Sequence, residues 1–129
     1  MIPGEQVLLY HFPDDMLRLV ESVFHRLNIK TTVLDDSALR EKIGYLLGWG
    51  GFRPASESFG DEDFDFPHEV MVLSGIKGKR LDAVLKELRK PDMPRITYKA
   101  VVTPFNIRWT LRRLCEKMRK EHEYLAKNG

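Results

Sequence analysis

The chain has very little cysteine and no long apolar segment. Cys115 is the only cysteine among 129 residues, which excludes an intramolecular disulfide and a Cys-x-x-Cys zinc or redox site. The longest apolar runs, such as residues 7–10 and 70–73, are far shorter than the roughly 20 residues of a transmembrane helix. The N-terminus lacks the basic start and apolar core of a signal peptide. We therefore expect a cytoplasmic protein that contacts no membrane.

Motifs for metals, nucleotides and catalysis are also missing. No two of the four histidines are three or four residues apart, and no G-x-G-x-x-G or H-E-x-x-H motif occurs. The basic turn at residues 75–80 is two residues too short for a Walker A loop. The pattern contains no recognisable nucleophile–base pair either. We therefore expect no metal and no cofactor, and the sequence favours a non-enzymatic role while leaving an enzymatic one open.

What is present is the composition of one globular domain, with an uneven distribution of charge. Residues 1–76 hold 6 basic and 13 acidic side chains, whereas residues 77–129 hold 15 basic and 6 acidic ones. Halves of opposite charge attract each other, within one chain or across a dimer. A basic half also attracts an anionic partner.

Hydrophobic periodicity predicts two similar runs of secondary structure. The first run contains a strand at residues 6–12, a helix, a strand at residues 29–34 and a second helix through Leu39 and Ile43 that ends at Gly48. Aspartates precede both helices and are predicted to cap them, because a carboxylate accepts hydrogen bonds from the first N–H groups of a helix. These aspartates are Asp14 or Asp15 for the first helix and Asp35 with Asp36 for the second.

The second run repeats this order. It contains a strand at residues 69–74, a helix stopped by Pro91, a strand at residues 96–103 and a long helix through Ile107 and Leu111. We predict an α/β fold, a single domain of two β-α-β-α units, with helices packed on a mainly parallel four-stranded sheet. The units span residues 6–47 and 69–126 and resemble an internal duplication, with offsets of 63 for the first strands, 64 for the first helices and 68 for the last helices. Shared βαβα periodicity alone is the alternative explanation.

Between the units, residues 48–66 fit no regular element and combine glycine, acidic charge and four phenylalanines. Loops of this length tend to be functional in compact domains. One interpretation is a solvated linker whose phenylalanines dock on the core. The other is an acidic–aromatic segment that covers the basic half, as a lid or as a clasp between two copies.

The last predicted helix places an aromatic ring among cations. Its apolar stripe contains Cys115, which we interpret as a core residue, whereas Trp109 is predicted to lie off that stripe. The cations predicted around the ring are Arg108, Arg112, Arg113, Lys117, Arg119 and Lys120. An internal cation–π contact or packing on the acidic segment would explain this pattern. A surface for an acidic protein segment, or for a base and its phosphates, is the functional alternative.

The segment around this helix start resembles a known family. It reads K-A-V-V-T-P-F-N-I-R-W-T-L over residues 99–111. This matches the K-A-V-x-T-P-x-N-x-x-W-T-L hallmark of a small bacterial family catalogued only as a domain of unknown function. The resemblance implies a cytoplasmic bacterial α/β domain and no mechanism. It also implies that Lys99, Thr103, Asn106 and Trp109 form one motif at the strand-to-helix corner, where Asn106 is placed to cap the last helix.

Three hypotheses about function follow. The first is a non-enzymatic binding or regulatory module for an acidic protein segment, its own loop or a second copy, without membrane contact. The second is a domain or modest enzyme for a phosphate-bearing small molecule, with Lys99, Thr103 and Asn106 meeting acids at the carboxyl ends of the strands. The third, less favoured, is RNA binding by the Trp109 surface. The predicted binding residues are Lys99, Thr103, Asn106, Arg108, Trp109, Arg112 and Arg113.

Overall fold

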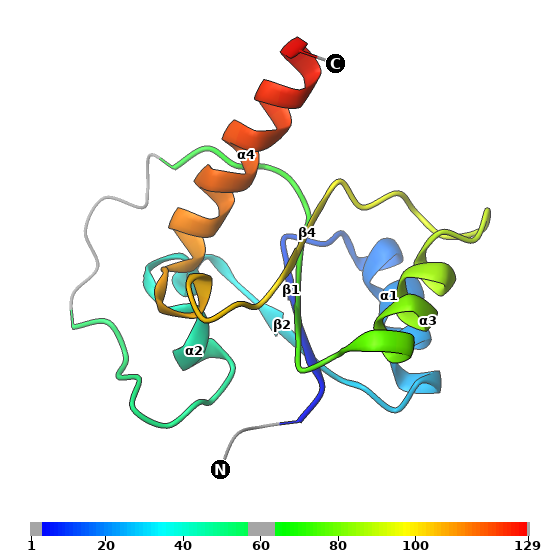
Figure 1. Ribbon diagram of the computed structural model, residues 1–129, viewed down its shortest axis with the longest axis horizontal. Helices are drawn as coiled ribbons and strands as arrows, with labels where there is room; N and C mark the ends of the chain where they lie inside the picture. Colours follow the sequence, from blue (N-terminus) through cyan, green and yellow to red (C-terminus); the bar gives the residue numbers. More distant parts are fainter. Residues whose placement is uncertain (1–3, 57–63, 129) are drawn as a thin grey trace.

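The computed structural model describes residues 4–56 and 64–128. Its strands are β1 (Gln6–Tyr10), β2 (Lys30–Leu34), β3 (Val70–Ser74) and β4 (Tyr98–Val101). Its helices are α1 (Asp14–Arg26), α2 (Ile43–Leu46), α3 (Gly78–Leu88) and α4 (Leu111–Asn128), with the 3-10 helices η1 (Asp36–Arg40) and η2 (Asn106–Arg108). Strands and helices alternate along the chain, as the sequence predicts (Figure 1).

The four strands form one sheet in the order β2-β1-β3-β4. β1 is parallel to β2 and β3 is parallel to β4, whereas the central pair of β1 and β3 is antiparallel. The predicted α/β fold with one four-stranded sheet is confirmed, and two of its three strand pairings are parallel. Each parallel pair is one β-α-β unit, because parallel neighbours need a crossover connection.

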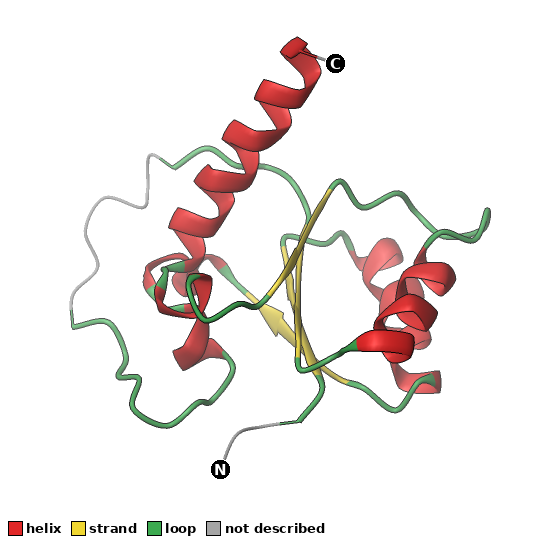
Figure 2. Ribbon diagram, viewed as in Figure 1, coloured by secondary structure: helices red, strands yellow, loops and turns green. Residues whose placement is uncertain are grey.

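Helices cover both faces of this sheet (Figure 2). α1 and α3 lie on one face, and α2 and α4 lie on the other. Successive side chains of a strand point to opposite faces, so the central strands supply both cores. Leu9 and Leu73 pack under α1 and α3, whereas Leu8 and Val72 pack under α2 and α4. No helix in the described parts of the chain is long and apolar enough to cross a membrane.

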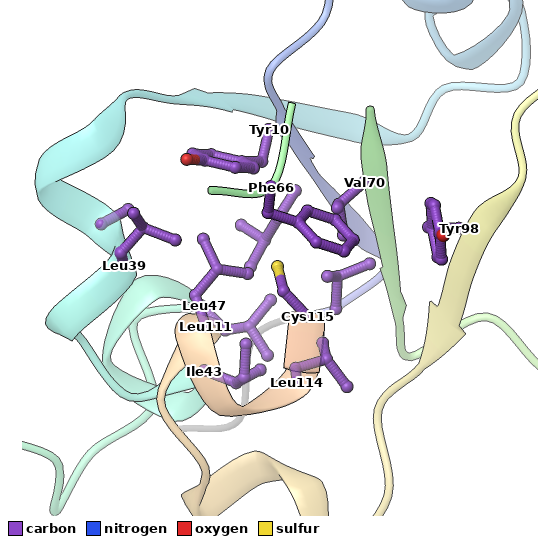
Figure 3. Packing of buried hydrophobic residues seen from close by; sticks show 13 residues of the cluster. Tyr10, Leu39, Ile43, Leu47, Phe66, Val70, Tyr98, Leu111, Leu114 and Cys115 are labelled. Carbon is purple, nitrogen blue, oxygen red and sulfur yellow. The ribbon is translucent and has the colours of Figure 1, made fainter. Parts of the chain in front are cut away.

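The core under α2 and α4 supports the candidate site (Figure 3). Leu111 and Cys115 of α4 are fully buried there, together with Ile43 of α2. Phe66, from the end of the loop between the two halves, enters the same core. Side chains from both halves therefore share one apolar interior, which holds α4 in place against α2.

The strand order and the strand pairings relate the two halves by an approximate local two-fold axis. It passes through the antiparallel centre of the sheet, where Leu8 pairs with Val72. Equivalent positions of the first strands are thus 64 residues apart. The predicted match of residues 7–9 with residues 70–72, at an offset of 63, is wrong by one residue. Such a slip would turn every matched side chain to the opposite face of the sheet.

The second helices of the two halves meet at a reciprocal backbone bridge. The Ile43 N–H donates to the Trp109 carbonyl (2.9 Å), and the Leu111 N–H donates to the Glu41 carbonyl (3.0 Å). The residues between these positions, Lys42 and Thr110, form an isolated antiparallel bridge. The two hydrogen bonds are equivalent under the two-fold axis, since each half donates one N–H group and accepts with one carbonyl group at the same position.

This bridge corrects the predicted extent of both second helices. Continuous helix is predicted through Leu39 and Ile43, and through Ile107 and Leu111. Each path instead makes a short 3-10 helix, then extended residues, and then an α-helix. The extended residues give their backbone groups to the other half of the molecule. The four apolar residues keep helical spacing in the sequence, so this spacing does not indicate that each helix is interrupted.

The helix ends agree only in part with the predicted caps. Pro13 occupies the N-cap position of α1, so Asp14 and Asp15 lie in the first turn, where the positive end of the helix dipole favours their charge. The cap by Asp35 is confirmed, because its carboxylate accepts from the Ser37 N–H (2.9 Å). Asn28 ends α1 in a left-handed conformation with φ of 59°.

Candidate functional site

The corner after β4 contains two of the predicted binding residues, Thr103 and Asn106. The Thr103 hydroxyl accepts hydrogen bonds from the N–H groups of Phe105 (3.2 Å) and Asn106 (3.0 Å). The buried Asn106 amide accepts from the Thr103 N–H (2.8 Å) and donates to the Val101 carbonyl (3.0 Å). These side chains therefore satisfy the backbone of their own turn, and their direct role is to shape it.

Asn106 does not cap α4, contrary to the prediction. It opens η2, and the helix begins five residues later at Leu111. The capping hydrogen bond comes from Thr110, whose hydroxyl accepts from the Arg113 N–H (3.1 Å). The start of α4 is displaced because Trp109 and Thr110 take part in the bridge to the first half.

Lys99 lies apart from the other residues of the hallmark motif. It is near the start of β4 and Thr103 follows the end, a separation of about 13 Å at the usual rise of a strand. The Lys99 ammonium donates to the Ile96 carbonyl (2.7 Å), at the amino end of the strand. The predicted convergence of Lys99 with Thr103 and Asn106 is therefore wrong.

Trp109 precedes α4 and is not part of that helix, which corrects the predicted position of Arg108 and Trp109 on it. The half-buried ring packs against the core and lies under two cations. The Arg113 guanidinium carbon is 5.0 Å from the ring centroid, and the Lys117 nitrogen is 5.9 Å away. We call Trp109, Arg113 and Lys117 the tryptophan stripe. Its two cations are exposed and form no ion pair with the described residues.

The opposite flank of α4 is covered by the chain itself. The Arg112 guanidinium lies over the Phe64 ring (4.7 Å to the centroid), and that of Arg119 lies over the Phe66 ring (4.8 Å). Arg119 also donates to the Asp65 carbonyl. The described end of the acidic–aromatic segment thus docks on the core and on the basic helix at once.

The rest of that segment bears on the lid hypothesis. Phe59 and the acidic residues 61–63, on which the hypothesis partly rests, lie outside the described residues. Residues 64–66 cover one flank of α4 and leave the tryptophan stripe on the other flank uncovered. A lid that opens therefore stays a prediction.

The carboxyl ends of the strands are divided between two edges of the sheet. Because β1 and β3 are antiparallel, His11 and Asp35 lie at one edge, whereas Gly75 and Thr103 lie at the other. The alternative site, which gathers strand-end acids with Thr103, is therefore not assembled. The described residues also contain no group of three or more His, Cys, Asp or Glu that could hold a metal ion.

One pocket of about 390 Å³ lies at the edge formed by β1 and β2. Three of its polar lining residues are engaged with protein groups: the Tyr10 hydroxyl donates to Asp36 (3.2 Å), and Ser37 donates to Asp35, which lies next to the pocket. The hydrogen bonds from Ser37 hold the pKa of Asp35 below its usual value. His11, at the rim, has a left-handed backbone with φ of 65°, which its two-fold mate Gly75 shares at 73°.

Cys115 is a core residue, as predicted. It is fully buried between α4 and the sheet, and this burial raises the pKa of its thiol to about 12. A thiol of that pKa is protonated at neutral pH and is a poor nucleophile.

A basic groove lies beside the reciprocal bridge. It has a volume of about 760 Å³, and Arg40, Lys42, Arg53 and Arg108 are the charged residues that line it, with no acidic residue among the described lining. Arg40 ends η1 and Arg108 ends η2, so these two arginines are mates under the two-fold axis. Lys42 belongs to the bridge, and Arg53 comes from the loop after α2. Three separate segments thus bring positive charge to one place.

The loop that carries Arg53 is anchored at two points. The Phe52 ring packs on Gly44 of α2, where an added Cβ would overlap the ring. Farther along, the Ala55 N–H donates to the Glu41 carboxylate (2.7 Å). This hydrogen bond commits the Glu41 carboxylate to the loop backbone, and Glu41 is not among the described residues that line the groove.

The comparison with protein families concerns the second half of the chain. Residues 69–125 match a family described as a domain of unknown function (DUF3783). The second half is similar to DUF3783. This match confirms the resemblance inferred from residues 99–111 at the level of a domain of unknown function. No curated protein and no solved structure matches the chain.

The DUF3783 segment supplies only part of the candidate site. Arg108 and the tryptophan stripe lie within it, whereas Arg40, Lys42 and Arg53 precede it. The sequence analysis missed these three cations because they belong to the half with an excess of acidic residues. Their local pattern, two basic residues before a glycine-rich turn and one after it, offers a signal, but no spacing in the sequence relates them to Arg108.

Within the DUF3783 segment, replacing Asn106 by Ala tests the structural role of the corner. The change leaves the Thr103 N–H and the Val101 carbonyl, both partly buried at these hydrogen bonds, without their side-chain partner. We expect the free energy of unfolding to fall by about 1–3 kcal/mol, measured by denaturant titration. Thr97→Ala, at an exposed position before β4, is the control. An unchanged stability of Asn106→Ala would contradict the structural role.

Proposed function

We propose that this protein is a non-enzymatic binding module of the bacterial cytoplasm, and that it recognises an acidic segment of a partner protein. The basic groove carries the proposal, because four cations from three segments line it without any acidic residue among the described lining. Like charges that line one groove repel each other, so an anionic partner would relieve this repulsion.

The guanidinium groups favour carboxylates as the bound groups. Arginine presents a planar set of donors that matches a carboxylate in a bidentate pair, and such charge-assisted hydrogen bonds are the stronger kind. Three of the four groove cations are arginines: Arg40, Arg53 and Arg108. A chain of Asp and Glu residues presents carboxylates at successive positions, which suits a groove whose cations come from separate segments.

The chain itself supports the same mode of recognition. Phe64 and Phe66 lie under arginines of α4, in a segment that also carries acidic residues. In the tryptophan stripe, the aromatic ring and the two cations beside it both come from the start of α4 and the residues before it, and the acidic–aromatic segment supplies neither. Trp109 directly follows Arg108, so the stripe starts one residue after a cation of the groove.

The test is the binding of a fluorescein-labelled peptide rich in Asp and Glu, followed by fluorescence anisotropy. We expect the double variant R53A/R108A to bind about tenfold more weakly or worse, because it loses charge-assisted hydrogen bonds. R18A/K79A removes the same net charge from exposed positions on α1 and α3, across the sheet, and is expected to bind as the parent does.

Two outcomes would contradict this function. Equal losses in both double variants would mean that only net charge attracts the peptide. Tighter binding of a labelled single-stranded RNA, with the same dependence on Arg53 and Arg108 and a steep loss with salt, would assign the groove to nucleic acid instead. Light scattering at low and high salt identifies a second copy of the chain as the partner, since a salt-sensitive dimer would show it.

A further inference from the structure

A second basic groove lies on another part of the molecule, between the α3–β4 connection and α4. It has a volume of about 830 Å³. Its basic lining residues are Arg89, Lys90, Arg95, Lys99 and His122. It shares no residue with the groove of the proposed function. The connection leaves α3 and returns to β4 as a loop without regular structure (Figure 1), which contains Pro91 and Pro94.

The positive charge of this second groove is largely uncompensated. No acidic residue lines it among the described residues. Lys90 forms an ion pair with Glu87 (2.5 Å), but Arg89 and Arg95 have no ion pair in the described part of the chain. Lys99 donates only to a neutral acceptor, the Ile96 carbonyl. Burial lowers the pKa of Lys99, and the charges of Arg89 and Arg95 lower it further.

The C-terminus of α3 accounts for the position of Arg89 but not for those of Arg95 and Lys99. The carbonyl groups at a helix C-terminus attract positive charge, and Arg89 directly follows the last residue of α3. This attraction falls off within one turn of the helix end. Arg95 and Lys99 belong to the approach to β4 and to the strand itself, so the helix end does not account for them.

We propose that this second groove binds a phosphate-bearing small molecule, with Arg89, Arg95 and Lys99 as the phosphate ligands. Two guanidinium groups and one ammonium supply several donors to a compact anion, and arginine matches phosphate oxygens in bidentate pairs. The groove is far larger than a phosphate group, and Met93 and Ile96 add apolar surface to its lining. This surface takes the organic part of the ligand.

The phosphate groove and the acidic-peptide groove share no residue. The predicted site for a phosphate-bearing molecule therefore lies elsewhere than the sequence suggests. Lys99 is a phosphate ligand in the second sequence-based hypothesis, where it acts with Thr103 and Asn106. In the structure the ligand site instead lies at the amino end of β4, with partners from the α3–β4 connection. Neither Thr103 nor Asn106 takes part.

The experiment uses inorganic phosphate as the probe, added to the full chain at constant ionic strength set with sodium chloride. Calorimetry measures its affinity, and amide NMR spectra locate its effects. We expect R95Q/K99Q to weaken phosphate binding about tenfold or more, through loss of charge-assisted contacts. R18Q/K79Q, which removes the same charge from exposed positions on α1 and α3, is the matched control and is expected to bind as the parent does.

The NMR measurement keeps the test valid if R95Q/K99Q folds poorly. In the parent protein, we expect phosphate to shift amide signals of residues 88–99 and to leave those of residues 50–56 in place. Equal weakening in both double variants would overturn the proposal, and so would shifts confined to residues 50–56. Displacement of the bound acidic peptide by phosphate would also overturn it, because the two grooves share no residue.

Discussion

Replacement of Leu111 by Ala is expected to lower the free energy of unfolding by about 2–5 kcal/mol. Leu111 is fully buried at the start of α4 and packs in the core that both halves share (Figure 3). Its backbone N–H is also one of the two donors of the reciprocal bridge, and the substitution leaves that hydrogen bond intact. The decrease in the free energy of unfolding therefore reports on the side chain alone. It is the sum of the lost apolar burial and the cost of the remaining cavity.

The control for this variant is Leu125→Ala on the same helix. Leu125 is 67% exposed, so the same truncation should change stability by no more than about 0.5 kcal/mol. Chemical denaturation of both variants gives the comparison. Ile43→Ala, at the two-fold mate of Leu111, should cost a similar amount, because Ile43 is equally buried. A loss below about 1 kcal/mol for Leu111→Ala would contradict the packing described for this core.

Replacement of Gly44 by Val is expected to disrupt the basic groove without changing any charge. A side chain at Gly44 overlaps the ring of Phe52, which must then leave α2 and take the loop with it. Overpacking of this kind costs about 1–3 kcal/mol of stability. Because Arg53 follows Phe52 directly, the displaced loop no longer holds its guanidinium in the groove. Peptide affinity should fall to the level expected when Arg53 alone is removed.

Gly50→Val is the matched control for this variant. An added Cβ at Gly50 meets no atom within 4 Å, although Gly50 lies in the same loop and lines the same groove. Stability and peptide affinity of Gly50→Val should remain close to those of the parent. If Gly44→Val kept full affinity, then the position of Arg53 would not matter for binding. This result would contradict the proposal that the peptide binds in the basic groove.

Much of the candidate site was beyond the reach of sequence analysis. The tryptophan stripe was predictable in part, since a cation–π contact of Trp109 was one interpretation of the sequence and Arg113 and Lys117 are one turn apart on α4. The basic groove was not, because Arg40 and Arg108 come together only through the two-fold relation between the halves. The same relation separates strand ends that an all-parallel sheet would gather at one edge.

The amino-acid sequence alone specifies the α/β class and the four strands. Each strand carries a run of apolar residues and each long helix carries one apolar stripe, and burial of those residues dominates the folding free energy. It also determined that Cys115 is interior and that Asp35 caps η1, since both depend on neighbours in the chain.

The antiparallel centre of the sheet and the breaks before α2 and α4 arise from contacts between the two halves of the chain. Apolar alternation is the same for parallel and antiparallel neighbours, so the pairing of Leu8 with Val72 leaves no trace in the pattern. The breaks arise because Glu41 and Trp109 accept hydrogen bonds from the opposite half. These hydrogen bonds join backbone groups, which almost every residue has. The periodicity of apolar side chains therefore cannot predict where they form.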